Sequence, residues 1–185
     1  MDDQLNQTSL KVIQRIKELE VHEGWKPNGN KPCDMFKMEI ENRIASKGTA
    51  IVPYNIEKIY EFLGKEETLL KLNPMLSEMK ILHNVEGEYR VNYMRYKGVW
   101  PVADRDFVNV ARKLREDEGK AYIGTTSCNY PFPAVDKVVR GEVYIGGYII
   151  EKIDESNTRV TYISDADMKG SIPGMVKNTL SSKQG

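Results

Sequence analysis

The sequence is poor in the residues on which several kinds of function depend. It has two cysteines, two histidines and no excess charge, since its 27 basic and 27 acidic residues cancel. No stretch gathers lysine and arginine on one face as a phosphate-binding surface requires, so we expect no nucleic-acid partner. Cys33 and Cys128 stand in no metal-ligand spacing. They predict free thiols in a reducing compartment, with a single disulfide as the alternative, and no metal site.

Long apolar runs are also missing. No segment approaches the length of a membrane span, and the N-terminus, MDDQLNQ, is acidic and polar, unlike a secretory signal. We therefore expect a cytoplasmic protein. A chain of 185 residues can bury roughly 70% of the surface that it exposes when unfolded. The expected organisation is a single, monomeric domain over residues 1–185.

Familiar catalytic arrangements are absent as well. His22 and His83 have no serine, cysteine or carboxylate pattern around them. Glycines occur singly, apart from Gly146 and Gly147, which predict a turn, so there is no glycine-rich loop to hold a phosphate. We expect neither a cofactor nor a catalytic residue.

Amphipathic helices are present in the first half of the chain. Apolar residues recur at helical spacing over residues 10–19, and this helix is expected to end near Gly24. Asn55 is a good N-cap for a helix over residues 55–64, whose apolar side chains form one stripe. A short helix over residues 66–72 is expected to follow.

Nine strand-like segments make up most of the remaining chain. Turn signals such as VEGE, EDEG, YIGGY and DESN separate the later seven. Only antiparallel neighbours can be joined by turns this short, so these seven predict one long antiparallel meander. The nine segments are residues 35–41, 45–54, 75–83, 88–96, 105–115, 120–128, 137–145, 147–153 and 158–166.

The last segment predicts a terminal amphipathic helix. Pro173 stands where the first turn of a helix tolerates proline. Asp165 and Asp167 precede it, and their spacing suits helix capping better than a catalytic pair of carboxylates. The apolar stripe of this helix contains Ile172, Met175, Val176, Thr179 and Leu180.

The expected strands are rich in tyrosine, methionine and small polar residues. A dry core favours leucine, isoleucine and valine, whereas these residue types line adaptable, partly wet cavities. A long twisted sheet with an apolar helix across it can enclose such a cavity. The alternative is the solvent face of a half-exposed sheet, and both interpretations remain open here. The residues are Asn92, Tyr93, Met94, Tyr96, Asn109, Thr125, Thr126, Ser127, Tyr148, Tyr162 and Ser164.

Five short motifs follow one another in the second half of the chain. They are WPVADRDFV, a Ser-x-x-x-Pro-type loop that starts at Ser127, VVR ending at Arg140, GGYII around Gly147, and DADMKGSIP around Gly170. In this order and at these distances they resemble the StAR-related lipid transfer (START) domain family. The resemblance covers nearly the whole chain and is strongest after Val99.

The resemblance implies an α+β helix-grip fold, in which a long curved antiparallel sheet grips a C-terminal amphipathic helix around a hydrophobic tunnel. It implies a non-enzymatic protein that binds a single lipid, such as a sterol or a phospholipid, and exchanges it at membrane surfaces. In such domains the loop before Arg-Asp-Phe forms part of the tunnel mouth. That loop runs from Lys97 to Asp104, which makes Trp100 a membrane-facing gate or a plug, unless it packs beneath a neighbouring loop.

The resemblance also suggests roles for individual residues. Arg105 and Asp106 are adjacent on a strand, so at most one faces the tunnel, and we expect structural pairing because a buried unpaired charge is costly. Further structural roles are expected for Arg140, Asp167, Gly170 and Pro173. The expected lipid-binding residues are Asn92, Met94, Tyr96, Trp100, Phe107, Asn109, Tyr148, Tyr162, Ile172, Met175, Val176 and Thr179.

The sequence departs from the family pattern in two places, at the expected headgroup position and in the length of the last helix. Some sterol-carrying members place an acid and an arginine on the strands beside the loop before Arg-Asp-Phe. Counted without gaps, these positions fall on Asn92 and Ala111 here, although Arg95 and Arg112 lie nearby if the register differs. A neutral floor of Asn92 and Asn109 suits a hydroxyl or carbonyl headgroup rather than a phosphate, which would require arginine or lysine. The thirteen residues from Pro173 to Gly185 make a last helix of only about 20 Å, which is shorter than is usual for the family.

Two other functions remain open at this point. A helix-grip enzyme, such as a cyclase or hydrolase, would need an acid or base with a perturbed pKa in the cavity, and Arg95, Asp165 and His83 are the candidates. A lipid-sensing interaction module would bind lipid without transferring it. The leading hypothesis is a cytoplasmic lipid transfer protein that visits membranes transiently.

Overall fold

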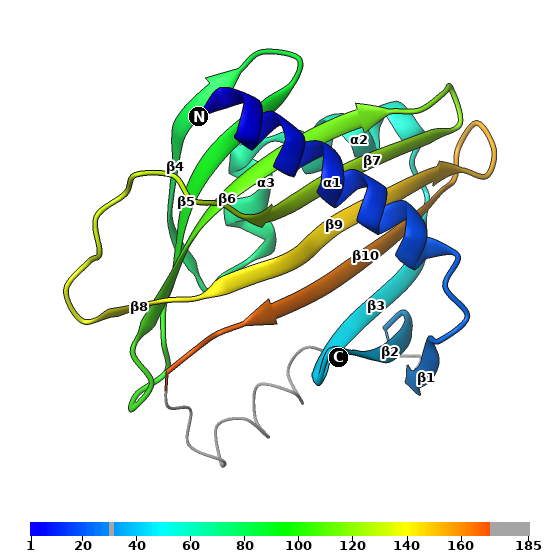
Figure 1. The fold of residues 1–185 in the computed structure, drawn as a ribbon. Helices are drawn as coiled ribbons and strands as arrows, with labels where there is room; N and C mark the ends of the chain where they lie inside the picture. Colours follow the sequence, from blue (N-terminus) through cyan, green and yellow to red (C-terminus); the bar gives the residue numbers. More distant parts are fainter. Residues whose placement is uncertain (30–31, 171–185) are drawn as a thin grey trace.

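The computed structural model describes residues 1–29 and 32–170. Within them the fold is α+β, as predicted, with helices on both faces of a large sheet (Figure 1). The elements are α1 (Asp2–Glu20), β1 (Lys26–Gly29), β2 (Asp34–Ile40), β3 (Arg43–Val52), α2 (Ile56–Gly64), α3 (Glu66–Leu72), β4 (Leu76–Val85), β5 (Tyr89–Tyr96), β6 (Asp104–Arg115), β7 (Lys120–Ser127), β8 (Val138–Arg140), β9 (Glu142–Lys152) and β10 (Thr158–Asp167).

The strands form one open sheet in the order β1-β2-β3-β10-β9-β7-β6-β5-β4. Every neighbouring pair in this order is antiparallel. Strands β4 to β7 are neighbours in chain order, and so are β9 and β10, which confirms the predicted meander for these strands. The short β8 departs from it, because it pairs in parallel with β6.

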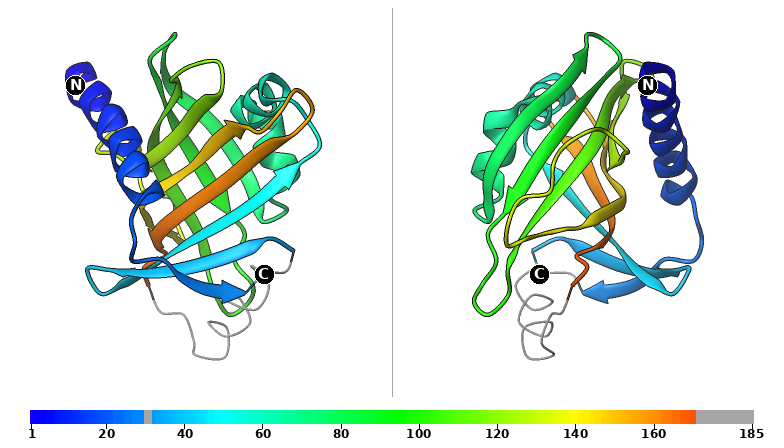
Figure 2. Two further views of the ribbon diagram at one scale, coloured as in Figure 1. Left: turned by 90° about the vertical axis from the view of Figure 1, so that its right-hand side faces the viewer. Right: turned by 60° about the vertical axis from the view of Figure 1, so that its left-hand side comes forward.

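Helix α1 covers one side of the sheet, which we call the α1 face (Figure 2). Its residues Val12, Ile13 and Ile16 are buried in a cluster with side chains of β7, β9 and β10. The helix begins at Asp2, earlier than predicted, because the buried stripe already includes Leu5. The acidic residues of its first turn also favour a helix N-terminus. It ends at Glu20, before the predicted end near Gly24.

Gly146 and Gly147 lie within β9, so the predicted turn is wrong. Gly147 is directly opposite Gly124 of β7. A Cβ on Gly147 would lie 2.4 Å from Ile16 Cδ1 and 2.3 Å from the carbonyl oxygen of Ile123. The missing side chains therefore let α1 approach the sheet closely.

Two further differences concern the limits of strands. Lys26–Gly29 forms β1 in a stretch of proline and glycine where the sequence predicts no strand, and it pairs with β2. The predicted strand over residues 137–145 is divided at Gly141 into β8 and β9. A Cβ on Gly141 would lie 2.4 Å from the ring of Phe107, so glycine is required at this close approach.

Helices α2 and α3 lie on the opposite side of the sheet, which we call the α2 face (Figure 2). Asn55 caps α2 as predicted, since its side-chain oxygen accepts the Lys58 N–H at 3.0 Å. Ile56, Ile59 and Leu63 of α2 are buried against β7 and β9. Helix α2 thus packs on the β7 and β9 part of this side of the sheet.

Two expectations concern membranes and the last helix. None of the helices in residues 1–29 and 32–170 is long and apolar enough to cross a membrane. The helix expected from Pro173, which the sheet would grip, lies outside the described residues. So do the expected lipid-binding residues Ile172, Met175, Val176 and Thr179.

Candidate functional site

Strand alternation places the expected binding residues of β5 and β6 on the α2 face. Val91 and Tyr93 of β5 are buried in one cluster with Leu5 of α1, so the residues between them point to the other side of the sheet. Asn92 lies directly opposite Asn109 of β6. The other expected residues of these strands that share this side are Met94, Tyr96 and Phe107.

Aromatic side chains continue this face across β9 and β10. Tyr148 lies opposite Tyr162, with ring centroids 4.8 Å apart, and packs with the buried residues of α2. Tyr96 packs edge-on against Phe107 at 5.6 Å. Burial raises the pKa of all three tyrosine hydroxyls, although Tyr162 has 43% of its surface exposed. The α2 face therefore presents several aromatic side chains whose hydroxyls stay protonated at neutral pH.

A row of polar side chains crosses the α2 face. Asn109 lies opposite both Asn92 and Ser127, which belong to the strands on either side of it. Ser127 Oγ donates to Asn109 Oδ1 at 2.9 Å. Asn92 is only 3% exposed, and its Oδ1 has no hydrogen-bond partner among the residues that the structure describes. Within the described residues, the row therefore combines an amide oxygen that has a donor, Asn109 Oδ1, with one that has none, Asn92 Oδ1.

The loop before β6 holds Trp100 away from the sheet. Trp100 is 91% exposed, so the alternative in which it packs beneath a neighbouring loop is wrong. Asp104 accepts the Gly98 N–H at 2.9 Å and pairs with Arg95 at 2.7 Å, and these donors lower the pKa of its carboxyl. A Cβ on Gly98 would lie 2.1 Å from the Val102 carbonyl oxygen. The loop thus presents the indole from a well-anchored base.

Arg105 is the member of the Arg-Asp pair that lies on the α2 face, where it is directly opposite Tyr96. The residue is only 5% exposed. Its guanidinium donates to the carbonyls of Ala103 at 2.6 Å, Met168 at 3.2 Å and Lys169 at 3.0 Å. It therefore joins the loop before β6 to the chain that follows β10.

Asp106 points to the opposite face and forms an ion pair with Arg140. The carboxylate accepts from Nε at 2.7 Å and from Nη2 at 3.1 Å, which raises the pKa of the Arg140 guanidinium. Asp106 is 1% exposed, so this bidentate contact compensates a fully buried charge. The parallel pairing of β8 with β6 places the two residues opposite each other.

The end of β10 contains the carboxylates that the sequence assigns to helix capping. Asp165 lies inside the strand and forms a bidentate pair with Arg43, so its predicted capping role is wrong. Asp167 accepts the Lys169 N–H at 2.8 Å. Lys169 and Gly170 then adopt positive φ angles of 47° and 67°, which turn the chain.

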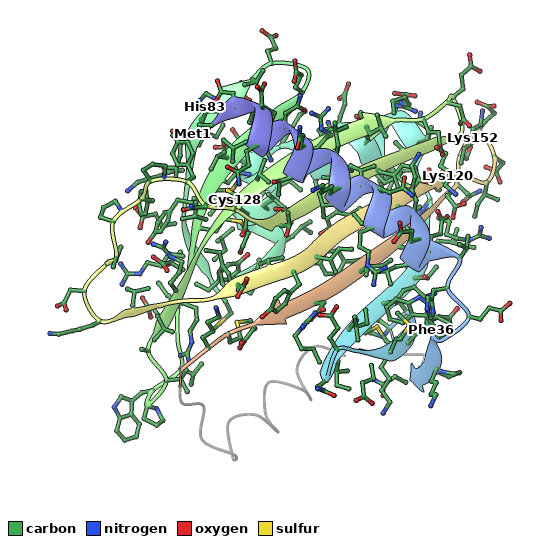
Figure 3. The ribbon with its side chains drawn as sticks, viewed as in Figure 1. Met1, Phe36, His83, Lys120, Cys128 and Lys152 are labelled. Atoms are coloured by element: carbon green, nitrogen blue, oxygen red, sulfur yellow. The ribbon has the colours of Figure 1, made fainter. Side chains whose placement is uncertain are left out.

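The groups that would favour an enzyme lie away from the α2 face. His83 lies beside Tyr89 and Tyr130, next to the N-terminus of α1 (Figure 3), and Arg95 is held by its ion pair in the loop base. Both cysteines are free, as expected, and burial raises the pKa of the Cys128 thiol to about 11. Within residues 1–29 and 32–170, no three His, Cys, Asp or Glu side chains gather into a metal site.

This face also contains residues that the sequence analysis missed, among them Arg90 and Gly48. Arg90 shares the parity of Asn92 and donates to the Gly64 carbonyl at the end of α2, where burial lowers the pKa of its guanidinium. Counting back by two from Asn92 leads to Arg90. Gly48 of β3 lies opposite Tyr162. No local pattern predicts that pairing, because β3 and β10 are far apart in the sequence.

Comparisons with known proteins agree with this architecture. A family model described as START domain matches residues 14–184. Human StAR-related lipid transfer protein 5 superimposes with a TM-score of 0.88 at 17% identity, covering 99% of this chain and 91% of that one. Human STARD10 gives 0.81 at 20% identity, covering 91% and 71%. Zhui aromatase/cyclase from Streptomyces sp. R1128 gives 0.51 at 14% identity, covering 69% and 70%.

The large antiparallel sheet, with its N-terminal helix on one face and amide and aromatic side chains on the other, defines a protein of the helix-grip class. Because the family model matches most of its length, the chain belongs to the START domain family. The resemblance drawn from its motifs is thereby confirmed. At these levels of identity, the solved structures add a likeness of fold.

Proposed function

We propose that the protein binds one lipid against the α2 face of its sheet and carries it between membranes without altering it chemically. The observation that supports this most directly is the gathering of the expected binding residues of four strands on one face. Accessible aromatic surface beside a few buried amides is the composition of an apolar ligand site with a point of orientation. In this proposal the chain acts as a single cytoplasmic domain.

The titratable groups on this face favour binding over catalysis. A general acid or base works best when its pKa lies near the pH at which the enzyme operates. Burial instead moves the pKa of Tyr96, Tyr148 and Tyr162 further above neutrality. These hydroxyls remain protonated and suit hydrogen bonding to a bound ligand.

The proposed contact with membranes uses the loop before β6. Val99 is 57% exposed and Trp100 is 91% exposed. Met168, whose carbonyl accepts from the Arg105 guanidinium, is 41% exposed. Tryptophan is enriched at membrane interfaces, where its ring meets the apolar layer and its N–H meets water. An anchored loop with this tip is suited to touch a bilayer while the lipid enters or leaves.

Transfer of a labelled lipid between donor and acceptor vesicles tests the proposal, together with mass spectrometry of organic extracts of the purified protein. Trp100→Ala is expected to slow transfer roughly tenfold, which corresponds to about 1.4 kcal/mol of lost membrane attachment. Its melting temperature should stay within about 2 °C of the parent protein, because the side chain packs against little else.

Val21→Ala serves as the control. Val21 is 77% exposed at the C-terminal end of α1, away from the loop of Trp100, so this variant should leave transfer unchanged. The absence of any extractable or transferable lipid would contradict the proposed function. A large fall in the melting temperature of Trp100→Ala would instead place the indole in the core and contradict its membrane role.

A further inference from the structure

The polar row on the α2 face has a defined order of hydrogen bonds. The Val143 N–H donates to Ser127 Oγ at 2.9 Å, and Ser127 Oγ donates to Asn109 Oδ1 at 2.9 Å. The one proton of the serine hydroxyl is therefore used. Since Asn109 turns its oxygen toward Ser127, its amide nitrogen directs two N–H donors away from the serine. Asn109 thus offers donors to a partner on its other side.

Asn92 stands on that other side, directly opposite Asn109. Its Oδ1 is buried and unpaired within the described part of the chain. A buried acceptor without a donor is a cost that folded proteins rarely leave uncompensated. The amide of asparagine turns about a soft torsion, so this oxygen can turn toward a donor that a ligand brings to the α2 face. A group placed between the two asparagines could accept a hydrogen bond from Asn109 Nδ2 and donate one to Asn92 Oδ1.

We propose that the polar row binds a free hydroxyl of an uncharged lipid. The hydroxyl oxygen accepts from Asn109 Nδ2, and its proton is donated to Asn92 Oδ1. An ether, an ester or a ketone can accept but has no proton to donate, so each leaves the Asn92 oxygen unpaired. This inference rests on the proposed lipid binding and names the class of ligand.

The cations of the α2 face favour an uncharged headgroup over an anionic one. The Arg90 guanidinium already donates to the Gly64 carbonyl at the end of α2. Arg105 donates to three main-chain carbonyls. A phosphate or carboxylate at the polar row would have no proton to donate to Asn92 Oδ1, so within the described residues that oxygen would stay unpaired.

Matched pairs of lipids test the inference on the purified full-length chain. Cholesterol and cholesteryl methyl ether form one pair, dioleoylglycerol and its methyl ether form a second, and oleate is the anionic probe. In whichever pair binds, we expect the lipid with the free hydroxyl to bind at least about tenfold more tightly than its ether, because the ether leaves Asn92 Oδ1 without a donor. Tighter binding of oleate than of either hydroxyl lipid would overturn the inference.

Asn92→Leu removes the acceptor while keeping the branching and the number of side-chain heavy atoms. The preference for hydroxyl over ether should then fall to near unity, while the melting temperature of the ligand-free protein stays the same or rises, since an unpaired polar atom has been removed. A purely structural role for Asn92 predicts a lower melting temperature instead. Asn129→Leu, at an exposed asparagine in the loop after β7, is the control and should keep the preference.

The unmodified protein decides the outcome even if a variant fails to fold. Equal affinity for both members of every pair that binds would overturn the hydroxyl inference and leave the proposed function intact. If no probe binds and no lipid is extracted, it is the proposed function that fails.

Discussion

The close approach of α1 to the sheet leads to a sharp prediction about Gly147. Replacing it with alanine adds one methyl group at a point where α1, β7 and β9 meet. That carbon would lie 2.3 Å from the Ile123 carbonyl oxygen and 2.4 Å from Ile16 Cδ1. Carbon atoms in contact are normally about 3.5–4.0 Å apart. The side chain of Ile16 can rotate away, but the carbonyl belongs to the sheet, so the backbone must move.

The expected destabilisation follows from the cost of overpacking. Extra carbon in a well-packed core typically costs about 1–3 kcal/mol, and a clash with backbone belongs at the upper end of that range. For a chain of this length, about 3 kcal/mol lowers the melting temperature by roughly 6–12 °C. Lipid binding by the folded variant should be unchanged, because Gly147 belongs to the face that α1 covers.

Urea denaturation followed by circular dichroism measures the effect. Gly146→Ala is the matched control, because its nearest contact would be the side-chain carbon Thr125 Cγ2 at 3.1 Å, and it should lose less than about 1 kcal/mol. Adding Ile16→Val to Gly147→Ala should recover part of the loss, since it removes one of the two clashing atoms. If Gly147→Ala unfolds at the same urea concentration as the parent, the close-packing argument is refuted.

Three further predictions concern stability. Asn55→Ala removes the side-chain cap of α2 and should cost about 1 kcal/mol in urea denaturation, whereas Asn55→Asp should cost almost nothing. Arg140→Met leaves Asp106 buried without its partner and should cost about 3 kcal/mol, so an unchanged midpoint would show that the pair is not needed. The pKa of Asp104 is lowered chiefly by the Gly98 N–H, so its contribution is present above its unfolded pKa of about 4 and is lost as the pH falls below it. Asp104→Asn should therefore be less stable than the parent at pH 7, with the difference shrinking toward about pH 3; a difference independent of pH would contradict this.

Helices and most strands follow from local pattern. Asn55 and the apolar stripe behind it predicted α2, because a cap and its helix are neighbours in sequence. The strand-like residues of EYRVNYMRY, bounded by turn signals, predicted β5 in the same way. The pair Gly146 and Gly147 misled for a physical reason: two glycines permit a turn, but they also permit another element to approach closely. Only the position of α1 distinguishes these two uses.

Local pattern could not predict which residues of each strand point to which side of the sheet. In β5 both alternating sets of residues contain apolar or aromatic side chains. Alternation alone therefore did not show whether Tyr93 or Asn92 faces the core. Tyr93 is buried with Leu5 of α1, which leaves Asn92 and its neighbours to the α2 face. Arg105 and Asp106 are a similar case, because alternation separates them without saying which one faces α2.

The sequence by itself determined the types of the elements, the antiparallel meander and the family to which the motifs belong, because capping, periodicity and short turns are local properties. The tertiary structure alone decided which side chains share a face and which of their polar atoms have partners. Asn109 is bonded to Ser127, and Ser127 to the main chain of Val143, across three strands. Such hydrogen bonds form only when distant segments pair, and only once they are in place is it clear that Asn92 Oδ1 has no partner within residues 1–29 and 32–170.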